Sequence, residues 1–212
     1  RYSLLGFPMH VSGLFIYPVK SLRGVAMPAM EIDALGFAGD RRFLVIDAAG
    51  KFMTQRQFPR MALVGTALTS TTLSLSAEGA GRMEIATASD PAAPLRAVAV
   101  WRSEGLLAED CGDAAAAWLG TVLQLKCRLV RIGEKFRRPV LKKAGQPGDI
   151  FSFADGAPIL VTSEASLADL AAALADGRTT AVTLAAQCLQ RIAAYDRSGP
   201  RLNAVPVLNP QA

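Results

Sequence analysis

Two short stretches near the N-terminus combine cationic and hydroxyl side chains at the ends of apolar segments. The first covers residues 17–21 (YPVKS) and the second covers residues 39–43 (GDRRF). Because proline interrupts regular strand pairing, we expect Lys20 and Ser21 to lie at the end of a strand. An ammonium, a hydroxyl and the guanidinium of Arg41 are together suited to binding an anion, most simply a phosphate. A solvated turn would show the same residue types, so the residues alone leave both interpretations open.

A second candidate anion site lies where an apolar segment runs into a helix. Residues 157–162 are predicted to form a buried strand, and Ser163 is the natural N-cap of the helix that follows. Backbone N–H groups and hydroxyls at the start of a helix bind anions readily. Thr162, Ser163 and Ser166 supply the hydroxyls at this turn. Plain helix capping explains the same residue types, so this alternative also stays open.

The charge of the chain invites an anionic partner. The formal net charge is +5, and basic residues gather in one run: Lys135, Arg137, Arg138, Lys142 and Lys143. Prolines and glycines in the same run predict an exposed loop, either simply solvated or forming a lip over an anionic ligand. Phe136 is the only aromatic residue there, so the stacking platform of a nucleic-acid site is missing.

The cysteines and the histidine exclude several classes of site. Cys111, Cys127 and Cys188 are odd in number and widely spaced, which argues against a disulfide framework and a structural zinc site and favours a reducing, cytoplasmic location. His10 is the only histidine, so the usual Ser/His/Asp and Cys/His constellations are excluded. No apolar run reaches the roughly 18 residues needed to cross a bilayer.

The first half of the chain has the pattern of an antiparallel β-barrel or sandwich. Short apolar segments alternate with turn residues, and 51% of the chain is hydrophobic, which is ample for a core. The expected strands are residues 11–19, 25–35, 42–47, 51–55, 61–68, 73–76, 82–87 and 96–101.

Helices enter the pattern after residue 110. Residues 113–123 are rich in alanine, and their larger apolar side chains recur at helical spacing, which predicts a helix packed on the barrel. A strand at 127–132 follows. The helix that starts at Ser163 should end at Gly177, and Thr179 and Thr180 can cap a further helix running to about residue 195.

Five of these stretches, taken together, resemble one known family. They are residues 13–21, 39–45, 54–60, 110–113 and 163–170. In this order they are similar to the MOSC proteins, the molybdenum cofactor sulfurase C-terminal domain proteins with their N-terminal β-barrel. This group includes the amidoxime-reducing components. The resemblance covers residues 11–170.

The resemblance implies that the chain binds the molybdenum cofactor, whose pterin carries a phosphate. Lys20, Ser21 and Arg41 match family positions near that phosphate and the pterin. The turn with Thr162, Ser163 and Ser166 matches another segment that faces the cofactor. The implied partners are the anionic pterin cofactor and a redox partner or a second chain that completes the barrel.

The resemblance stops near Leu170. An Arg-Phe-Arg-Pro-Asn type stretch and a later cysteine that ligates molybdenum should follow in the family, and neither matches this chain. We therefore assign no catalytic residue and no metal ligand. Residues 171–212 are instead similar to the N-terminal helices of amidase signature enzymes, without their Ser-Ser-Lys residues. A natural fusion, a frameshift, a sequence artefact or an engineered chimera would each produce this pattern.

These observations predict an α+β, mostly β fold. It comprises an antiparallel N-terminal β-barrel with a packed helix over residues 1–130, an incomplete MOSC-type barrel over 131–170, and a helical hairpin over 171–212. The expected function is that of a molybdopterin-binding fragment related to MOSC oxidoreductases or sulfur carriers. We expect it to be catalytically incomplete, because the segment with the metal-ligand cysteine does not match this chain, and its status as an enzyme stays open. The alternatives are a fragment of an amidase-type hydrolase and a non-enzymatic interaction module.

Overall fold

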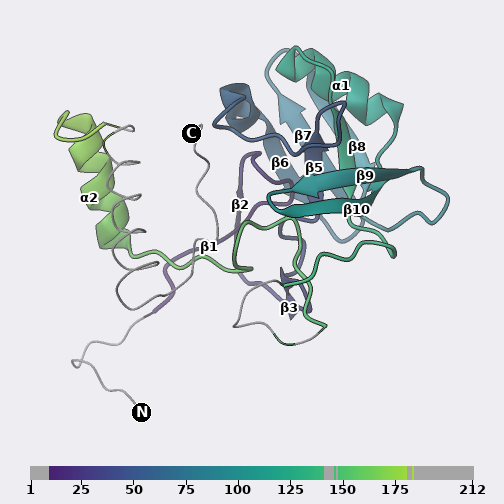
Figure 1. Cartoon of the computed structure of the whole chain (residues 1–212). Coiled ribbons are helices and arrows are strands. Elements are labelled where there is room, and N and C mark those ends of the chain that lie inside the picture. The colour runs from purple at the N-terminus through teal and green to yellow at the C-terminus, as the bar shows by residue number, and fades with distance from the viewer. Residues whose placement is uncertain (1–9, 141–145, 147, 181–182, 184–212) are drawn as a thin grey trace. The chain divides into compact units, whose positions relative to one another are not determined.

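The computed structural model describes residues 10–140, 146, 148–180 and 183 (Figure 1). The chain divides into two compact units. The first comprises residues 1–140 and 146–155, and the second comprises residues 141–145 and 156–212. All strands of the described residues belong to the first unit, whereas helix α2 (Glu164–Ala175) belongs to the second.

A four-stranded antiparallel sheet forms the centre of the first unit. Its order is β5 (Phe43–Ile46), β11 (Arg128–Arg131), β10 (Ser103–Asp110) and β9 (Leu95–Val100). Every residue of β5 is buried, as expected for an apolar segment with elements packed on both of its faces. The strand pairing therefore joins the N-terminal stretch that carries the predicted site residues to strands from the middle of the chain.

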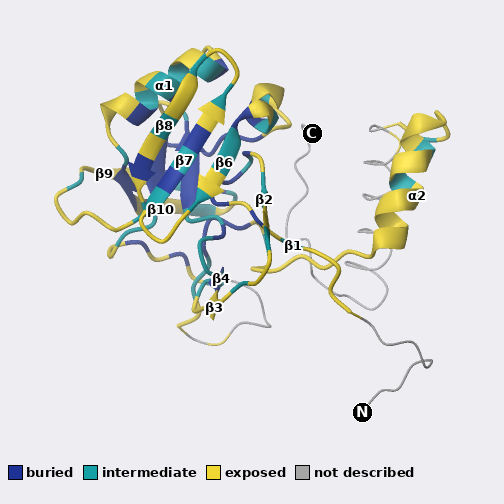
Figure 2. Ribbon diagram, turned by 180° about the vertical axis from the view of Figure 1, so that it is seen from behind, coloured by how far each residue is buried: buried dark blue, intermediate teal, exposed yellow. Residues whose placement is uncertain are grey.

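Shorter strands complete the first unit. A three-stranded antiparallel sheet contains β6 (Gly65–Leu68), β7 (Thr72–Ala77) and β8 (Gly81–Ala86), and Figure 2 shows the buried residues of β7 in dark blue. Two small antiparallel pairs lie outside these sheets. They are β1 (Leu14–Ile16) with β2 (Val25–Met27), and β3 (Ile32–Asp33) with β4 (Gly36–Phe37).

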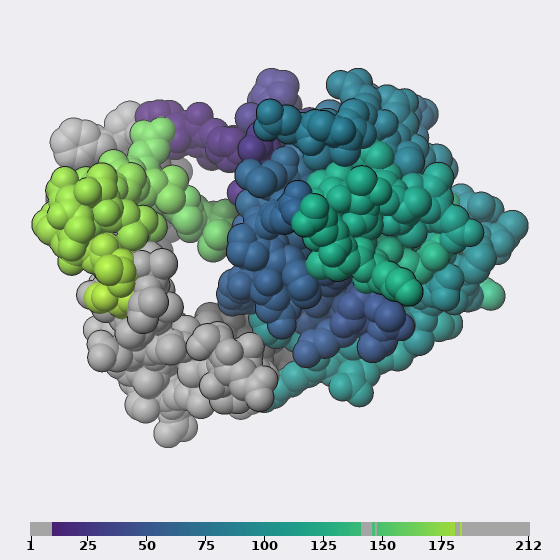
Figure 3. All heavy atoms as spheres, turned by 90° about the horizontal axis from the view of Figure 1, so that it is seen from above, coloured from purple at the N-terminus to yellow at the C-terminus, as the bar shows by residue number. Residues whose placement is uncertain are grey.

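Helix α1 (Asp113–Leu123) covers one side of this unit, as the view from above shows (Figure 3). Its bounds are those predicted from the sequence. Leu119 and Leu123 lie in a core shared with β7, β8 and β11. Trp118 packs at the edge of this core, and its indole N–H donates to the carbonyl of Ala80 at 2.8 Å. The prediction that this apolar stripe packs on the barrel is confirmed.

Replacing Leu119 with alanine should lower the free energy of unfolding by about 3 kcal/mol, because a fully buried leucine leaves a cavity when it is truncated. Chemical denaturation followed by circular dichroism measures this change. Leu63→Ala is the matched control, since Leu63 is 65% exposed and the same truncation there should cost less than about 0.5 kcal/mol. Equal losses in the two variants would contradict the assignment of Leu119 to the core.

Several predicted strands differ from the structure in their details. Residues 59–63 form a 3-10 helix (Pro59–Leu63) because Pro59 sits at its start, so only β6 remains of the strand predicted at 61–68. The segment at 25–35 breaks into β2 and β3, and residues 51 and 52 form isolated bridges in place of a regular strand. Strand β10 was not predicted, since its charged and glycine residues hide the alternation of its buried side chains.

The predicted buried strand at 157–162 is wrong. No regular secondary structure is present there, and Leu160 and Val161 are 80% and 86% exposed. A strand requires a neighbouring strand to accept and donate its backbone hydrogen bonds. Within the described residues this segment has no such neighbour, so the apolar composition alone was misleading.

The helix that follows is confirmed together with its caps. Ser163 accepts a hydrogen bond from the backbone N–H of Ser166 at 3.1 Å, and Gly177 adopts a φ of 65° after the end of α2. Thr180 accepts a similar hydrogen bond from the N–H of Thr183, but the rest of the second helix of the predicted hairpin lies outside the described residues.

The predicted α+β, mostly β class is confirmed by the antiparallel sheets and the two helices. The predicted division at residues 130 and 170 stays a prediction. Across residues 10–140, 146, 148–180 and 183, no helix combines the length and the apolar character that crossing a bilayer requires.

Candidate functional site

The fold joins the two N-terminal stretches that carry Lys20, Ser21 and Arg41. Val19 and Phe43 form a parallel bridge, and the N–H of Lys20 donates to the carbonyl of Phe43 at 3.0 Å. The N–H of Arg41 donates to the carbonyl of Tyr17 at 2.8 Å. The three predicted residues therefore lie on neighbouring segments of the first unit.

Lys20 is the most deeply placed cation of this group. Its side chain is only 7% exposed, and its ammonium donates to the carbonyl of Phe153 at 2.9 Å and to Oδ1 of Asp155 at 2.5 Å. Burial lowers the pKa of Lys20 from its ordinary value, and the ion pair with Asp155 only partly opposes this. The nearby charges of Arg138 and Arg41 lower the pKa further, so an additional anion would stabilise the ammonium.

Arg41 is held at the surface end of the same group. Its guanidinium pairs with the carboxylate of Asp40, which is itself buried and accepts a hydrogen bond from the N–H of Tyr17 at 2.7 Å. The guanidinium carbon lies 5.2 Å from the centre of the Tyr17 ring, within the range of a cation–π contact. The side chain of Arg41 is 24% exposed and so can meet a ligand.

Arg138 corrects the prediction that the whole basic run is an exposed loop. This residue is buried, and its guanidinium donates to the carbonyls of Ser152 at 2.8 Å and Ala154 at 2.5 Å. These carbonyls offset the cost of burying the charge. Of the other members of the run, Lys135 and Arg137 are exposed as predicted, and Lys142 and Lys143 lie outside the described residues.

Asp155 and Trp101 complete the group, and the sequence did not reveal either of them. The indole N–H of Trp101 donates to Oδ1 of Asp155 at 2.7 Å, and the guanidinium of Arg56 lies 5.5 Å from the Trp101 ring. Burial acts to raise the pKa of Asp155, but Lys20, the Trp101 N–H and Arg56 together hold it below its ordinary value. Two features of the sequence could have singled them out: Trp101 lies between two strands, and Asp155 follows directly after a buried aromatic segment.

Positive charge is in excess in this group. The cations are Lys20, Arg41, Arg56 and Arg138, and the carboxylates are Asp40 and Asp155. Two of the cations, Lys20 and Arg138, are buried, and both have Asp155 as their nearby carboxylate, so positive charge outweighs negative charge where burial makes it costly. An anionic ligand would balance this excess, so the arrangement suits anion binding better than a solvated turn would.

The backbone supports the same conclusion. Among the described residues, positive φ angles occur at four non-glycine positions: Ser21 at 65°, Arg41 at 48°, Trp101 at 55° and Gln124 at 59°. Gln124 is the C-cap of α1, where a left-handed residue is ordinary. The other three belong to the group around Lys20. Because sparsely populated backbone conformations cluster at binding sites, their coincidence here favours a functional role.

Thr162, Ser163 and Ser166 belong to the second unit and are exposed. The hydroxyls of Ser163 and Ser166 lie 2.8 Å apart and cap α2. Capping accounts for these two residues, so a part for the turn in cofactor binding stays a prediction.

The described cysteines do not form a metal centre. Burial raises the pKa of the Cys111 thiol to about 12 and that of the Cys127 thiol to about 11, so neither is a thiolate at neutral pH. Within the described residues no group of three or more His, Cys, Asp or Glu side chains is placed to hold a metal ion. Cys188 lies outside the described residues.

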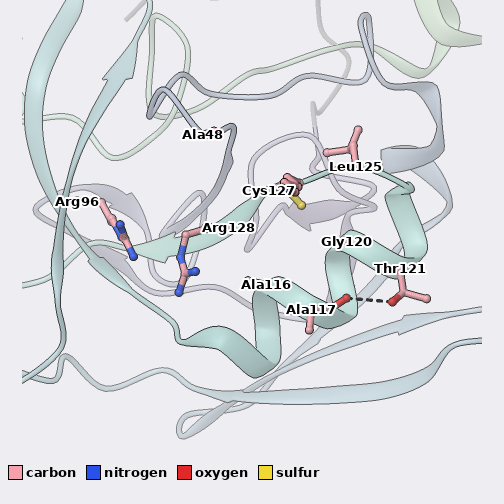
Figure 4. A pocket seen from close by; sticks show the side chains of 10 residues that line it. Ala48, Arg96, Ala116, Ala117, Gly120, Thr121, Leu125, Cys127 and Arg128 are labelled. Atoms are coloured by element: carbon pink, nitrogen blue, oxygen red, sulfur yellow. Dashed lines mark hydrogen bonds between the residues drawn. The ribbon is translucent and has the colours of Figure 1, made fainter.

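A separate hollow of about 730 Å³ lies beside α1 and the start of β11. Figure 4 shows Arg96 and Arg128 next to each other at its edge. Both guanidinium groups already pair with Asp110, at 2.7 and 2.5 Å, and Arg128 also pairs with Asp113. These cations are neutralised within the protein, so the hollow is a weaker candidate for anion binding than the group around Lys20.

Comparisons with known proteins agree with the resemblance inferred from the sequence. Residues 9–126 match the family described as the MOSC N-terminal beta barrel domain. The mitochondrial amidoxime-reducing component 1 of Homo sapiens is 37% identical over 175 residues, covering 76% of this chain and 50% of that protein. Its Mus musculus counterpart is 35% identical over 169 residues, covering 76% of this chain and 49% of that protein.

A more distant relative is the molybdenum cofactor sulfurase of Danio rerio. It is 27% identical over 174 residues, which cover 78% of this chain and 21% of that protein. The chain spans about half the length of the amidoxime-reducing components that it matches. These matches give no support to the amidase resemblance of residues 171–212. Because the domain match extends over more than half of its residues, the chain belongs to the family of the MOSC N-terminal beta barrel domain.

Proposed function

We propose that this chain binds the molybdenum cofactor, molybdopterin, and anchors the phosphate of its pterin at Lys20, Ser21 and Arg41. The observation that carries the proposal is the excess of positive charge around the buried ammonium of Lys20. A phosphate monoester carries close to two negative charges at neutral pH, so it matches this excess better than a single carboxylate does.

Each anchor contributes a different interaction. Lys20 supplies a compact charge at a fixed position, because its side chain is buried and held by the carbonyl of Phe153. Arg41 adds a partly exposed guanidinium that can donate to phosphate oxygens. Ser21 adds a hydroxyl from a left-handed turn next to Lys20. Together they would neutralise the phosphate and orient the ring system attached to it.

The residues present fit the phosphate of the cofactor but not its metal. The described cysteines keep their protons at neutral pH, so they supply no thiolate to molybdenum. When bound, the cofactor supplies the oxygen- or sulfur-transfer chemistry of an oxidoreductase or sulfur carrier. Our proposal for this chain is therefore limited to binding and orientation.

Three further points belong to the same proposal. Thr162, Ser163 and Ser166 would form a second segment that faces the cofactor. The proposed partners, besides the anionic pterin cofactor, are a redox partner or a second chain that completes the barrel. A cytoplasmic location stays a prediction, and the names of the amidoxime-reducing components that the chain matches place those proteins in mitochondria.

A loading assay tests the proposal. Purified chain is incubated anaerobically with molybdopterin, separated by gel filtration, and assayed for the fluorescence of the oxidised pterin. We expect about one pterin per chain to co-elute with the protein, and inorganic phosphate in excess to reduce the retained amount, because it competes for the same cations. Retention at the level of a carrier protein such as serum albumin would refute the proposal.

A further inference from the structure

Two hydrogen-bond donors in the first unit converge on a single oxygen. The ammonium of Lys20 lies 2.5 Å from Oδ1 of Asp155, and the indole N–H of Trp101 lies 2.7 Å from the same atom. Lys20 and Asp155 are 135 positions apart in the sequence, and Trp101 comes from the turn between β9 and β10. Three distant segments thus meet to place one anionic oxygen between two donors.

The two donors are packed within the protein, whereas the acceptor is largely exposed to solvent. The side chain of Lys20 is 7% exposed, while that of Asp155 is 68% exposed. The Trp101 ring is held between Phe52, with ring centres 4.9 Å apart, and the guanidinium of Arg56. Rotation of the Asp155 side chain into solvent would leave the ammonium and the indole N–H pointing at the same position.

The backbone conformation of Trp101 is unusual for its residue type, which suggests that the side chain is needed at this position. Its φ of 55° places a bulky aromatic residue in the left-handed region, which such residues rarely adopt. Glycine would make this turn without strain. A tryptophan here is better explained by the placement of its side chain than by the needs of the turn.

We propose that Trp101 is a further binding residue of the phosphate site, and that the carboxylate of Asp155 occupies the position of a phosphate oxygen until the ligand displaces it. The proposal rests on the proposed function, because it assumes that the anion binds at Lys20. The ligand class is a phosphate monoester dianion. On binding, one phosphate oxygen accepts from both Lys20 and Trp101, and Asp155 turns towards solvent.

The indole N–H resonances of the wild-type chain test this directly. The sequence contains two tryptophans, and the N–H of Trp118 donates to the carbonyl of Ala80 in the turn between β7 and β8, so it serves as an internal control. Inorganic phosphate and phenyl phosphate are titrated separately into ¹⁵N-labelled protein, and the Trp118→Phe variant assigns the two signals. We expect the Trp101 signal to move with either ligand and the Trp118 signal to stay. Tighter binding of phenyl phosphate would identify an ester, and equal binding would identify the free ion.

Calorimetric affinities of four variants for phenyl phosphate complete the test. Asp155→Ala should bind about tenfold more tightly than wild type, because the internal competitor is gone. In that background Trp101→Phe should weaken binding about tenfold, because it removes one hydrogen bond to a charged acceptor and keeps the ring. Lys20→Met should abolish binding in either background.

The outcomes separate this inference from the proposed function. If Lys20→Met abolishes binding while the Trp101 signal stays fixed and Trp101→Phe has no effect, the role of Trp101 is refuted and phosphate binding at Lys20 stands. If neither phosphate compound binds, or Lys20→Met changes nothing, the proposed function itself fails. Weaker binding by Asp155→Ala would refute the part assigned to Asp155.

Discussion

Replacing Lys20 with methionine is expected to weaken the binding of molybdopterin or phenyl phosphate by at least about a hundredfold. A hydrogen bond between charged groups contributes about 1.5–3 kcal/mol, and loss of the charge itself adds to this because the site is largely removed from water. Methionine keeps the length and apolar stem of the side chain, and it removes only the ammonium, which lies 5.7 Å from the centre of the Phe52 ring. Calorimetry, together with pterin retention after gel filtration, measures the loss.

The stability of the same variant separates a binding role from a structural one. Lys20 is a buried cation whose pKa is lowered by burial, so its removal also relieves a cost that folding imposes. The carbonyl of Phe153 loses one donor, and we expect the free energy of unfolding to change by less than about 2 kcal/mol.

Lys126→Met is the matched control for this experiment. Lys126 is exposed in the connection between α1 and β11, so the substitution removes the same charge from the chain without touching the candidate site. It should leave the affinity within about twofold of wild type, since exposed charges are screened by salt. Equal losses of affinity in the two variants would show that net charge, and not the position of Lys20, governs binding.

The parts of the fold that were predictable are those in which local pattern and tertiary packing agree. Helix α1 has its apolar residues on one face, and that face is the one that the core buries, so its bounds could be read from the sequence. Residues 157–162 show the opposite case. Their apolar run predicts burial, but burial of a strand depends on a neighbour that composition does not specify.

Some residues of the candidate site could likewise be predicted from the sequence, and others could not. Lys20, Ser21 and Arg41 belong to two compact motifs, so residue types and order were enough to single them out. Arg138 was predicted to lie in an exposed loop because prolines and glycines surround it, and only the fold shows that its guanidinium donates to the carbonyls of residues 152 and 154. Trp101 and Asp155 acquire their significance from a contact across 54 positions, which no local pattern encodes.

The second large effect is expected away from this site, at Glu109 on β10. Its carboxylate accepts from Nε of Arg131 at 2.9 Å, from the N–H of Asp90 at 2.9 Å and from the hydroxyl of Ser89 at 2.5 Å. Both side chains of the ion pair are less than 10% exposed, at 4% and 7%. Gly133 permits this placement, because a Cβ there would lie 1.8 Å from Oε1 of Glu109.

Replacing Glu109 with glutamine should lower the free energy of unfolding by about 3–5 kcal/mol at pH 7, because the buried guanidinium of Arg131 is left without a counter-charge. Urea denaturation measures the change. Glu104→Gln is the matched control, since Glu104 is an exposed glutamate on the same strand and its substitution should cost less than about 0.5 kcal/mol.

The pH dependence tests whether the charge of Glu109 is responsible. Burial acts to raise the pKa of Glu109, but the bonds from Ser89, Asp90 and Arg131 together lower it below its ordinary value. A carboxyl group whose pKa is lower in the folded state stabilises the fold above its unfolded pKa of about 4.3, and this contribution is lost as the pH falls through the folded pKa. The free energy of unfolding of the wild type should therefore fall more steeply in acid than that of Glu109→Gln. The difference in free energy of unfolding between the two proteins should narrow as the pH falls. A difference that stays constant from pH 7 to the acid limit would assign the loss to the altered shape of the hydrogen-bond network and not to the missing charge.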